Sequence, residues 1–288
     1  MRSAWIGIVL SCVVASAQVW KPVGSPSAVS DATGTGLQDY GKVSGRALAV
    51  AVDPSDSSGN TVYVGTVGGL WRTTNGAAVD AKTVAWSPLT DAQASLVAGA
   101  VAVKPDDPNT IVVGTGEGDG SANALYGRGL LVSGDRGATW TNVTSAGAAQ
   151  LTGAGFTSIA YSTDVTSVVV ASVAASAYAS WFPNAYRGLI YSADGGHSWA
   201  QASVTDTGAT VAGASATHVI YNRFTHKFYA ALRYHGLYES SDGANFTRMQ
   251  VQPFAGLTKT IRWYLGNQAW CNSVRTGEYR AWMEKQYT

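Results

Sequence analysis

The sequence of 288 residues is poor in charge and in cysteine. Only 13% of the residues are charged, and the formal net charge is +1. A chain this close to neutrality lacks the basic surface that binds nucleic acid or acidic lipids, so neither is expected as a partner. The two cysteines, Cys12 and Cys271, are too few for a disulfide framework. The apolar run at residues 4–15 is too short to span a bilayer.

That apolar run is typical of an export signal. Arg2 precedes it, and Ala15-Ser16-Ala17 supplies a small-x-small cleavage site. We therefore expect residues 1–17 to be a signal peptide and the protein to be secreted or periplasmic in a bacterium, without membrane contact after cleavage. A buried N-terminal strand is one alternative. A lipoprotein signal at Cys12 is another, although Leu10 fits that pattern poorly.

Glycine and aromatic residues are abundant, with 33 Gly, 10 Trp and 14 Tyr. This composition suits an all-β protein with many tight turns. Four segments also repeat the same order of blocks: an apolar run such as "ALAVAVDPSD", a β-branched run such as "TVYVGT", a run that begins Gly-Leu, and an aromatic residue with a short strand. Repeats of four short strands predict a β-propeller. We expect a partial propeller of about four four-stranded blades over residues 18–252.

The third and fourth blocks share a sharper motif, S-x-D-x-G-x-x-W. Two full copies lie 59 residues apart, and a third copy is one residue shorter. The motif resembles the Asp-box (BNR repeat) of sialidases, sortilin-type receptors, xyloglucanases and many secreted bacterial repeat proteins. The resemblance covers roughly residues 43–251 and implies structural roles on the face away from the binding site. The motif residues are Ser133, Asp135, Gly137, Trp140, Ser192, Asp194, Gly196, Trp199, Ser240, Asp242, Gly243 and Phe246.

Four blades are fewer than the six or more that Asp-box propellers usually have. The segment "QVWKPVG" at residues 18–24 resembles a lone fourth strand of the kind that closes a propeller ring. Its partner blade is missing from the repeats that we can align. An open arc would expose blade edges, which are a liability for aggregation.

Two long loops between the second and third strands lie on the opposite, usual binding face of such a propeller. Aromatic, Arg and carboxylate side chains in these loops suit stacking on and hydrogen bonding to a glycan. The alternative is a purely structural role, in which the aromatic side chains only pack the loops. The candidate ligand-binding residues are Glu117, Asp119, Tyr126, Arg128, Tyr178, Trp181, Tyr186 and Arg187.

Other chemistries find little support in the sequence. The stretch "GTGEGDG" has the wrong glycine spacing for a dinucleotide loop, and two carboxylates are too few for a calcium site. A sialidase-type arginine triad cannot be placed. The "TDVGG"-like stretch of xyloglucanases lacks its Asp at Thr66-Val67-Gly68-Gly69. We therefore predict no catalytic residues, no metal ligands and no cofactor, and we do not favour an enzyme.

The C-terminal segment, residues 253–288, changes character. Leu257, Ile261, Tyr264 and Leu265 follow a helical period instead of the alternation of strands. The segment resembles the C-terminus of dTDP-glucose 4,6-dehydratases, with Thr276 and Cys271 as departures. The matching residues are Gly256, Leu257, Lys259, Thr260, Ile261, Trp263, Tyr264, Leu265, Asn267, Trp270, Gly277, Tyr279 and Trp282.

That family is NAD-dependent and uses a Tyr-x-x-x-Lys pair, which occurs nowhere in this chain. The resemblance therefore implies a chimera with a foreign helical tail and without dehydratase activity; a helical cap on the last blade is the alternative. We expect a secreted, non-catalytic binding or adhesion module for a glycan or a cell-surface protein. Alternative functions are a remnant of a sialidase- or xyloglucanase-type glycoside hydrolase, and a chain named a dehydratase from its tail alone.

Overall fold

The computed structural model describes residues 28–29, 42–43, 46–121, 123–176, 180–252, 265–269 and 272. The predicted signal peptide and the strand predicted at residues 18–24 lie outside the described residues. Near the N-terminus, β1 (Ala28–Val29) pairs with β2 (Lys42–Val43). Of the predicted tail, the structure describes only residues 265–269 and 272, and all of these except Asn267 are helical.

The body of the protein consists of four units, each with four antiparallel strands in chain order; three are separate sheets and the fourth is part of a six-stranded sheet. We call them blades 1 to 4. Blade 1 contains β3 (Ala47–Val52), β4 (Val62–Thr66), β5 (Gly69–Thr73) and β6 (Ser87–Pro88). Blade 2 contains β7 (Ala98–Lys104), β8 (Asp107–Thr115), β9 (Leu130–Ser133) and β10 (Thr141–Val143). Blade 3 contains β13 (Ala154–Tyr161), β14 (Val169–Ala175), β15 (Gly188–Ser192) and β16 (Ala200–Gln201). Blade 4 contains β19 (Ala216–Asn222), β20 (Lys227–Leu232), β21 (Gly236–Ser240) and β22 (Asn245–Arg248).

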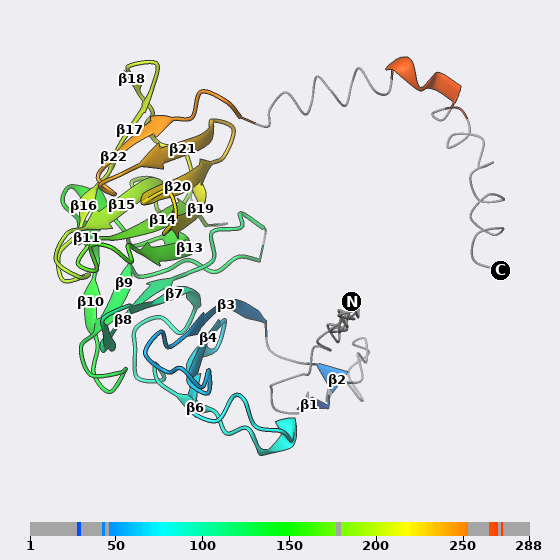
Figure 1. The fold of residues 1–288 in the computed structure, drawn as a ribbon, viewed down its shortest axis with the longest axis vertical. Helices are drawn as coiled ribbons and strands as arrows, with labels where there is room; N and C mark the ends of the chain where they lie inside the picture. The colour runs from blue at the N-terminus through cyan, green and yellow to red at the C-terminus, as the bar shows by residue number, and fades with distance from the viewer. Residues whose placement is uncertain are drawn as a thin grey trace, which may run out of the picture.

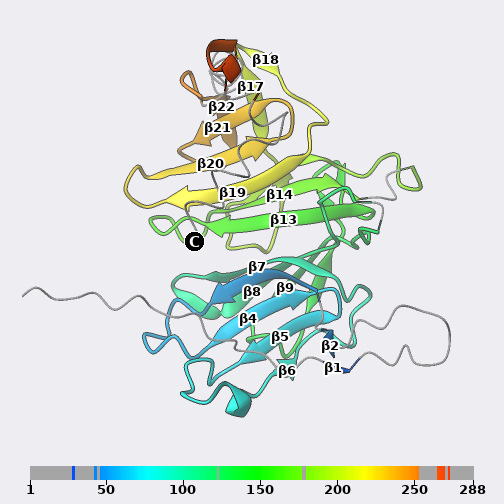
Figure 2. The ribbon, with the colours of Figure 1, turned by 90° about the vertical axis from the view of Figure 1, so that its right-hand side faces the viewer.

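The blades follow one another in chain order, from blade 1 at the lower end of Figure 1 to blade 4 at its upper end. The first strands β3, β7, β13 and β19 contact one another in sequence, and Figure 2 shows them side by side. Apart from the 3₁₀ turn η1 (Ala81–Thr83), the described body is β-structure and loops. The prediction of an all-β fold is confirmed, and the arrangement agrees with a partial propeller. None of the described helical residues belongs to a helix long and apolar enough to cross a membrane.

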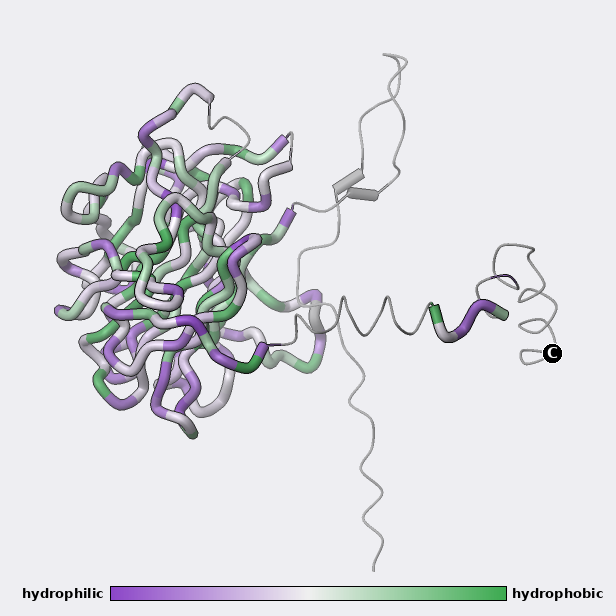
Figure 3. Tube along the Cα trace, turned by 90° about the horizontal axis from the view of Figure 1, so that it is seen from above, coloured by the Kyte–Doolittle hydropathy of each residue, from purple (hydrophilic) through white to green (hydrophobic). Residues whose placement is uncertain are grey.

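The core lies between the blades. One apolar cluster joins blades 1 and 2, a second joins blades 2 and 3, and a third joins blades 3 and 4. Strands β8 and β14 belong to the two middle blades, and their apolar segments are buried on both faces. Such strands read as continuous apolar runs because both faces are covered. Hydrophobic segments accordingly run through the middle of the body in Figure 3.

Two short hairpins occupy the links between blades and were not predicted. The first consists of β11 (Ser145–Ala146) and β12 (Ala149–Gln150), and the second of β17 (Ser203–Asp206) and β18 (Ala209–Thr210). β17 pairs in parallel with β22 and so extends blade 4 to a sheet of six strands. The link after blade 3 therefore helps to cover the outer edge of blade 4.

Candidate functional site

The S-x-D-x-G turn of blade 2 is closed by its own side chains. The Ser133 hydroxyl donates to Asp135 Oδ1 at 2.8 Å and accepts the Gly137 N–H at 2.8 Å. Asp135 in turn accepts the N–H and the hydroxyl of Thr139, at 2.8 and 2.6 Å. Gly137 has a φ of 87°, a left-handed conformation that favours glycine. All of these groups are therefore used inside the turn.

The turns of blades 3 and 4 repeat this geometry. Asp194 accepts the Ser198 N–H at 2.9 Å, and Asp242 accepts the Asn245 N–H at 2.8 Å. The hydroxyl of Thr139 and its N–H lower the pKa of Asp135 to about 2. For Asp194 partial burial acts in the opposite direction, but the hydrogen bonds from Ser198 outweigh it and lower the pKa to about 2. These carboxylates are thus hydrogen-bonded acceptors within turns.

Blade 1 makes the same turn with other residues. The Thr73 hydroxyl donates to Asn75 Oδ1 at 2.9 Å, and the Ala85 N–H donates to the same oxygen at 3.0 Å. The inserted residues between these two positions form a separate loop that contains η1. Trp140, at the end of the blade 2 turn, donates its Nε1–H to the carbonyl of Leu89 at 2.9 Å. This hydrogen bond ties blade 2 to blade 1.

The glycine-rich stretch "GTGEGDG" lies at the other end of blade 2, where β8 leads into the long loop toward β9. Its glycines permit close packing. A Cβ on Gly114 would lie 2.3 Å from the Phe156 side chain, and one on Gly118 would lie 2.5 Å from Thr157 Cγ2. Because these glycines have no side chains, the loop can pass directly against β13. The Glu117 backbone forms an isolated parallel bridge with Phe156 at this point.

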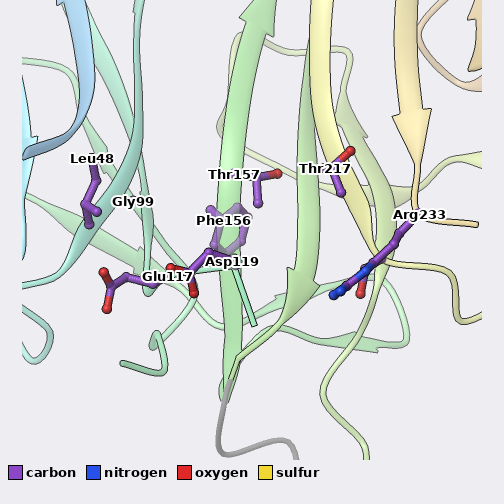
Figure 4. A pocket seen from close by; sticks show the side chains of 10 residues that line it. Leu48, Gly99, Glu117, Asp119, Phe156, Thr157, Thr217 and Arg233 are labelled. Carbon is purple, nitrogen blue, oxygen red and sulfur yellow. The ribbon is translucent and has the colours of Figure 1, made fainter. Parts of the chain in front are cut away.

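A hollow of about 340 Å³ opens where this loop meets the starts of the first strands. Blades 1 to 4 all contribute to it, together with the β20–β21 loop. Figure 4 shows Phe156 at its centre, with Glu117 and Asp119 on one side and Arg233 on the other. The lining residues are Leu48, Gly99, Glu117, Gly118, Asp119, Phe156, Thr157, Ser215, Thr217 and Arg233.

Glu117 is the most unusual side chain of the hollow. It is 2% exposed, and only one of its two carboxylate oxygens has a hydrogen-bond partner among the described residues. Its Oε2 accepts the Leu125 N–H at 2.9 Å and pairs with Arg46 Nη2 at 3.0 Å. Its Oε1 is buried and has no hydrogen-bond partner among the described residues. Buried acceptors are nearly always paired, so this oxygen has a hydrogen-bonding capacity that the described residues leave unmet.

Asp119 and Arg233 lie on different sides of Phe156 in Figure 4. Asp119 Oδ1 accepts the N–H of Ser121 at 3.0 Å and its hydroxyl at 2.9 Å. Arg233 Nη1 lies 3.3 Å from the position that a Cβ on Gly120 would take, so the guanidinium reaches the loop of blade 2. Two carboxylates and two guanidinium groups, including Arg46, give the surroundings a balanced charge.

The other predicted loop residues are not among those that line the hollow. Tyr126 packs on Phe182 with 4.8 Å between ring centroids, so it joins the two long loops. Tyr186 donates its hydroxyl to the Leu189 carbonyl at 3.0 Å, and burial raises its pKa to about 12. The backbone of Arg128 forms an isolated antiparallel β-bridge with Thr152. The side chain of Trp181 is 69% exposed, and that of Arg187 is half-buried. Tyr178 lies outside the described residues.

Within the described ranges, no group of three or more His, Cys, Asp and Glu side chains is arranged to hold a metal ion. Sequence reasoning found Glu117 and Asp119 but did not select Phe156, Thr157, Ser215 or Thr217. These residues lie in the first halves of β13 and β19 or directly precede β19. The innermost strands of a propeller surround its central channel. The first block of each sequence repeat is such a strand, so the residues at its start could have been selected as candidates from the repeat alone.

No family model matches the chain. A short C-terminal match links it to dTDP-glucose 4,6-dehydratases. The Salmonella typhimurium protein is 46% identical over 33 residues, and dehydratase 1 of Escherichia coli is 42% identical over 33 residues. Each match covers 12% of this chain and 9% of the relative.

The body of the protein resembles GH74 enzymes of known structure. An ancestral GH74 enzyme superposes with a TM-score of 0.52 and 19% identity, over 81% of this chain and 26% of that enzyme. A GH74 enzyme of Niastella koreensis superposes with a TM-score of 0.46 and 17% identity, over 69% of this chain and 30% of that enzyme. The first likeness shows a shared propeller fold. The chain spans about a quarter of the length of that enzyme.

Proposed function

We propose that the hollow binds one unit of a neutral glycan chain without cleaving it, and that Glu117 Oε1 accepts a hydroxyl of the ligand. The unpaired state of this buried oxygen supports the proposal. A buried acceptor without a partner costs roughly 1–3 kcal/mol, and a ligand hydroxyl that reaches it would recover this energy. A hydroxyl suits the site because Arg46 already balances the charge of Glu117.

The rest of the lining fits the same ligand class. The side chain of Leu48 supplies apolar surface. The hydroxyls of Thr157 and Thr217 each donate to a backbone carbonyl and can still accept a hydrogen bond from a ligand. Arg233 adds several hydrogen-bond donors in a fixed geometry. A mostly apolar wall with a few convergent polar groups is the usual form of a small-molecule site. Sugars present both apolar faces and hydroxyl groups, so this combination suits them.

A second candidate function is a remnant of a glycoside hydrolase. GH74 enzymes are glycoside hydrolases, and Glu117 and Asp119 line the same hollow here. Glycosidases need a pair of carboxylates about 5–9.5 Å apart across the scissile bond. We favour binding alone because Glu117 is already held by Arg46 and Leu125, and Asp119 by Ser121.

Binding and cleavage can be separated in one experiment. The full chain is run in affinity gels that contain xyloglucan or another neutral polysaccharide, and the same mixtures are tested for new reducing ends. Retardation of the protein without new reducing ends is the expected result. Cleavage that is lost in both Glu117→Gln and Asp119→Asn would establish the hydrolase instead. Absence of both retardation and cleavage on all polysaccharides would overturn the two functions together.

We also propose that the protein is exported and that its C-terminal segment is a borrowed dehydratase-like end without the active site of that enzyme. The 33-residue match to dehydratases supports the second part. Continuous sequencing reads of the native genome across codons 245–262 are the expected outcome for a natural fusion. A break in the reads at that junction would contradict it.

A further inference from the structure

The outward faces of the two terminal blades carry apolar side chains that nothing covers among the described residues. In β4 and β20, buried and half-buried residues alternate, whereas the apolar runs of β8 and β14 are buried throughout. On blade 1, Val50, Val64 and Trp71 stand opposite one another across three strands. Val50 is 69% exposed, and Val64 and Trp71 are half-buried. We call Val50, Val52, Val62, Val64 and Trp71 the blade 1 end face.

The strand register shows what covers the same positions in the other blades. Val50 pairs with Val64, as Val101 pairs with Val113 in blade 2 and Val219 with Ala230 in blade 4. Val101 and Val219 are 8% and 2% exposed, because each packs against the preceding blade. The blade 1 end face is thus built like a surface that receives a preceding blade.

The outward face of blade 4 is its counterpart. Leu237 pairs with Ala231, as Leu70 pairs with Gly65 and Leu130 with Gly114. Leu70 and Leu130 are fully buried under the following blade, whereas Leu237 is only half-buried. We call His218, Ile220, Tyr229, Ala231 and Leu237 the blade 4 end face; its Ile220 is 48% exposed. This face is built like a surface that receives a following blade.

We propose that a second copy of this chain covers both end faces, with blade 4 of each copy packed on blade 1 of the other. The two contacts are identical and related by a twofold axis, so the pair closes into one ring of blades. A head-to-tail contact of this kind forms a ring when its rotation closes. Each new contact continues the interface that already joins the blades three times within the chain.

A second copy explains why both ends carry apolar side chains and yet differ from each other. A self-complementary contact would need only one such face per chain. Two unlike faces, each with the register of one side of an internal blade contact, need a partner that presents both. A second copy is such a partner. Its docking would also remove exposed apolar sheet faces, which are otherwise a risk for aggregation.

Sedimentation velocity on the full chain, over a range of micromolar concentrations, tests this assembly. The wild type is expected at twice the mass of one chain. Val50→Glu and Ile220→Glu each place a charge in both contacts of the pair, so we expect the dimer to weaken at least tenfold. Val165→Glu is the matched control, because Val165 is 56% exposed in a turn of blade 3, away from both end faces. Circular dichroism confirms that each variant is folded.

A mixture of the two end-face variants makes the test specific. Val50→Glu keeps an intact blade 4 end face and Ile220→Glu an intact blade 1 end face, so the mixture can form one native contact that neither variant can form alone. Dimers in the mixture but not in the separate variants are the expected result. A wild type that stays monomeric, an Ile220→Glu variant that dimerises normally alone, or open-ended polymers would overturn the proposal.

Discussion

At the scale of single residues, buried polar atoms divide into those used by the fold and those left free. The hydroxyls of Ser133, Ser192 and Ser240 each accept a glycine N–H and donate to an aspartate. Glu117 Oε1, at the opposite end of blade 2, has no such partner among the described residues. This contrast is the reason for assigning the turns to structure and the hollow to binding.

Replacement of Ser133 by alanine should destabilise the protein. The change leaves the N–H of Gly137 without its acceptor in a buried turn. An unpaired buried donor costs roughly 1–3 kcal/mol in the free energy of unfolding, measured by urea denaturation. Ser203→Ala, at an exposed serine of β17, is the control and should change stability little. Equal losses in the free energy of unfolding for the two variants would show that the Ser133 hydroxyl does not stabilise the turn.

Acid should weaken the turns over a defined pH range. The pKa values of Asp135, Asp194 and Asp242 are lowered from 3.8 to about 2 in the folded protein. Their contribution to stability is therefore full above pH 3.8 and is lost as the pH falls toward 2. Thermal unfolding followed by circular dichroism should show a falling midpoint across this range, with a shallower fall in Asp135→Asn. A midpoint independent of pH between 4 and 2 would contradict these pKa values.

At the scale of elements, the sequence predicted strand type and order well but not register. By letters alone, "SVVVAS" aligns Val168 with Ile111 of "TIVVGT". In the structure, Tyr161 pairs with Val169 as Val103 pairs with Ile111, so Val169 is the equivalent residue. A shift of one residue moves a side chain to the other face of the sheet. Apolar residues that are buried on both faces give no alternation from which the register could be read.

The link hairpins and the hollow were harder to predict for related reasons. β11, β12 and β18 are only two residues long each, and their pairing depends on neighbouring segments. The hollow depends on four strand starts that converge from different repeats. By contrast, Glu117 and Asp119 could be selected from the sequence because charge is rare in this chain and two carboxylates in one glycine-rich loop are conspicuous.

The glycine-rich loop should tolerate no side chain at Gly118. Gly118→Ala would place a Cβ 2.5 Å from Thr157 Cγ2 and 2.9 Å from Ala174 Cβ. Overpacking of this kind costs about 1–3 kcal/mol and would displace the loop that carries Glu117. Gly134→Ala is the matched control, because a Cβ there has no neighbour within 4 Å. Denaturation midpoints that are equal for the two variants would contradict the packing role of the loop.

At the scale of the whole molecule, the chain combines parts with two different likenesses. Its body shares a fold with a GH74 enzyme. A separate match of 33 residues links the chain to dehydratases and covers 9% of their length. From the sequence, the all-β class and the four-blade repeat could be predicted because each repeat restates the same pattern. The ligand could not, because a propeller supports many functions and its sites lie on variable loops.

The dehydratase likeness predicts no cofactor binding. The chain contains no Tyr-x-x-x-Lys pair, and the match spans 9% of the length of the relatives. Titration of the full chain with NAD, followed by protein fluorescence, should therefore show no saturable change. Saturable binding at micromolar NAD would contradict the interpretation of the tail as an isolated end of an enzyme.

Titration calorimetry of the full chain with soluble xyloglucan oligosaccharides tests whether Glu117 holds a glycan in the hollow. We expect measurable binding by the wild type and at least tenfold weaker binding by Glu117→Gln. Hydrogen bonds to charged groups contribute about 1.5–3 kcal/mol, and about 1.4 kcal/mol corresponds to a factor of ten in affinity. Glu239→Gln, which alters a carboxylate paired with Lys227 outside the hollow, should bind like the wild type. Binding by Glu117→Gln equal to that of the wild type and of this control would show that Glu117 does not hold the glycan.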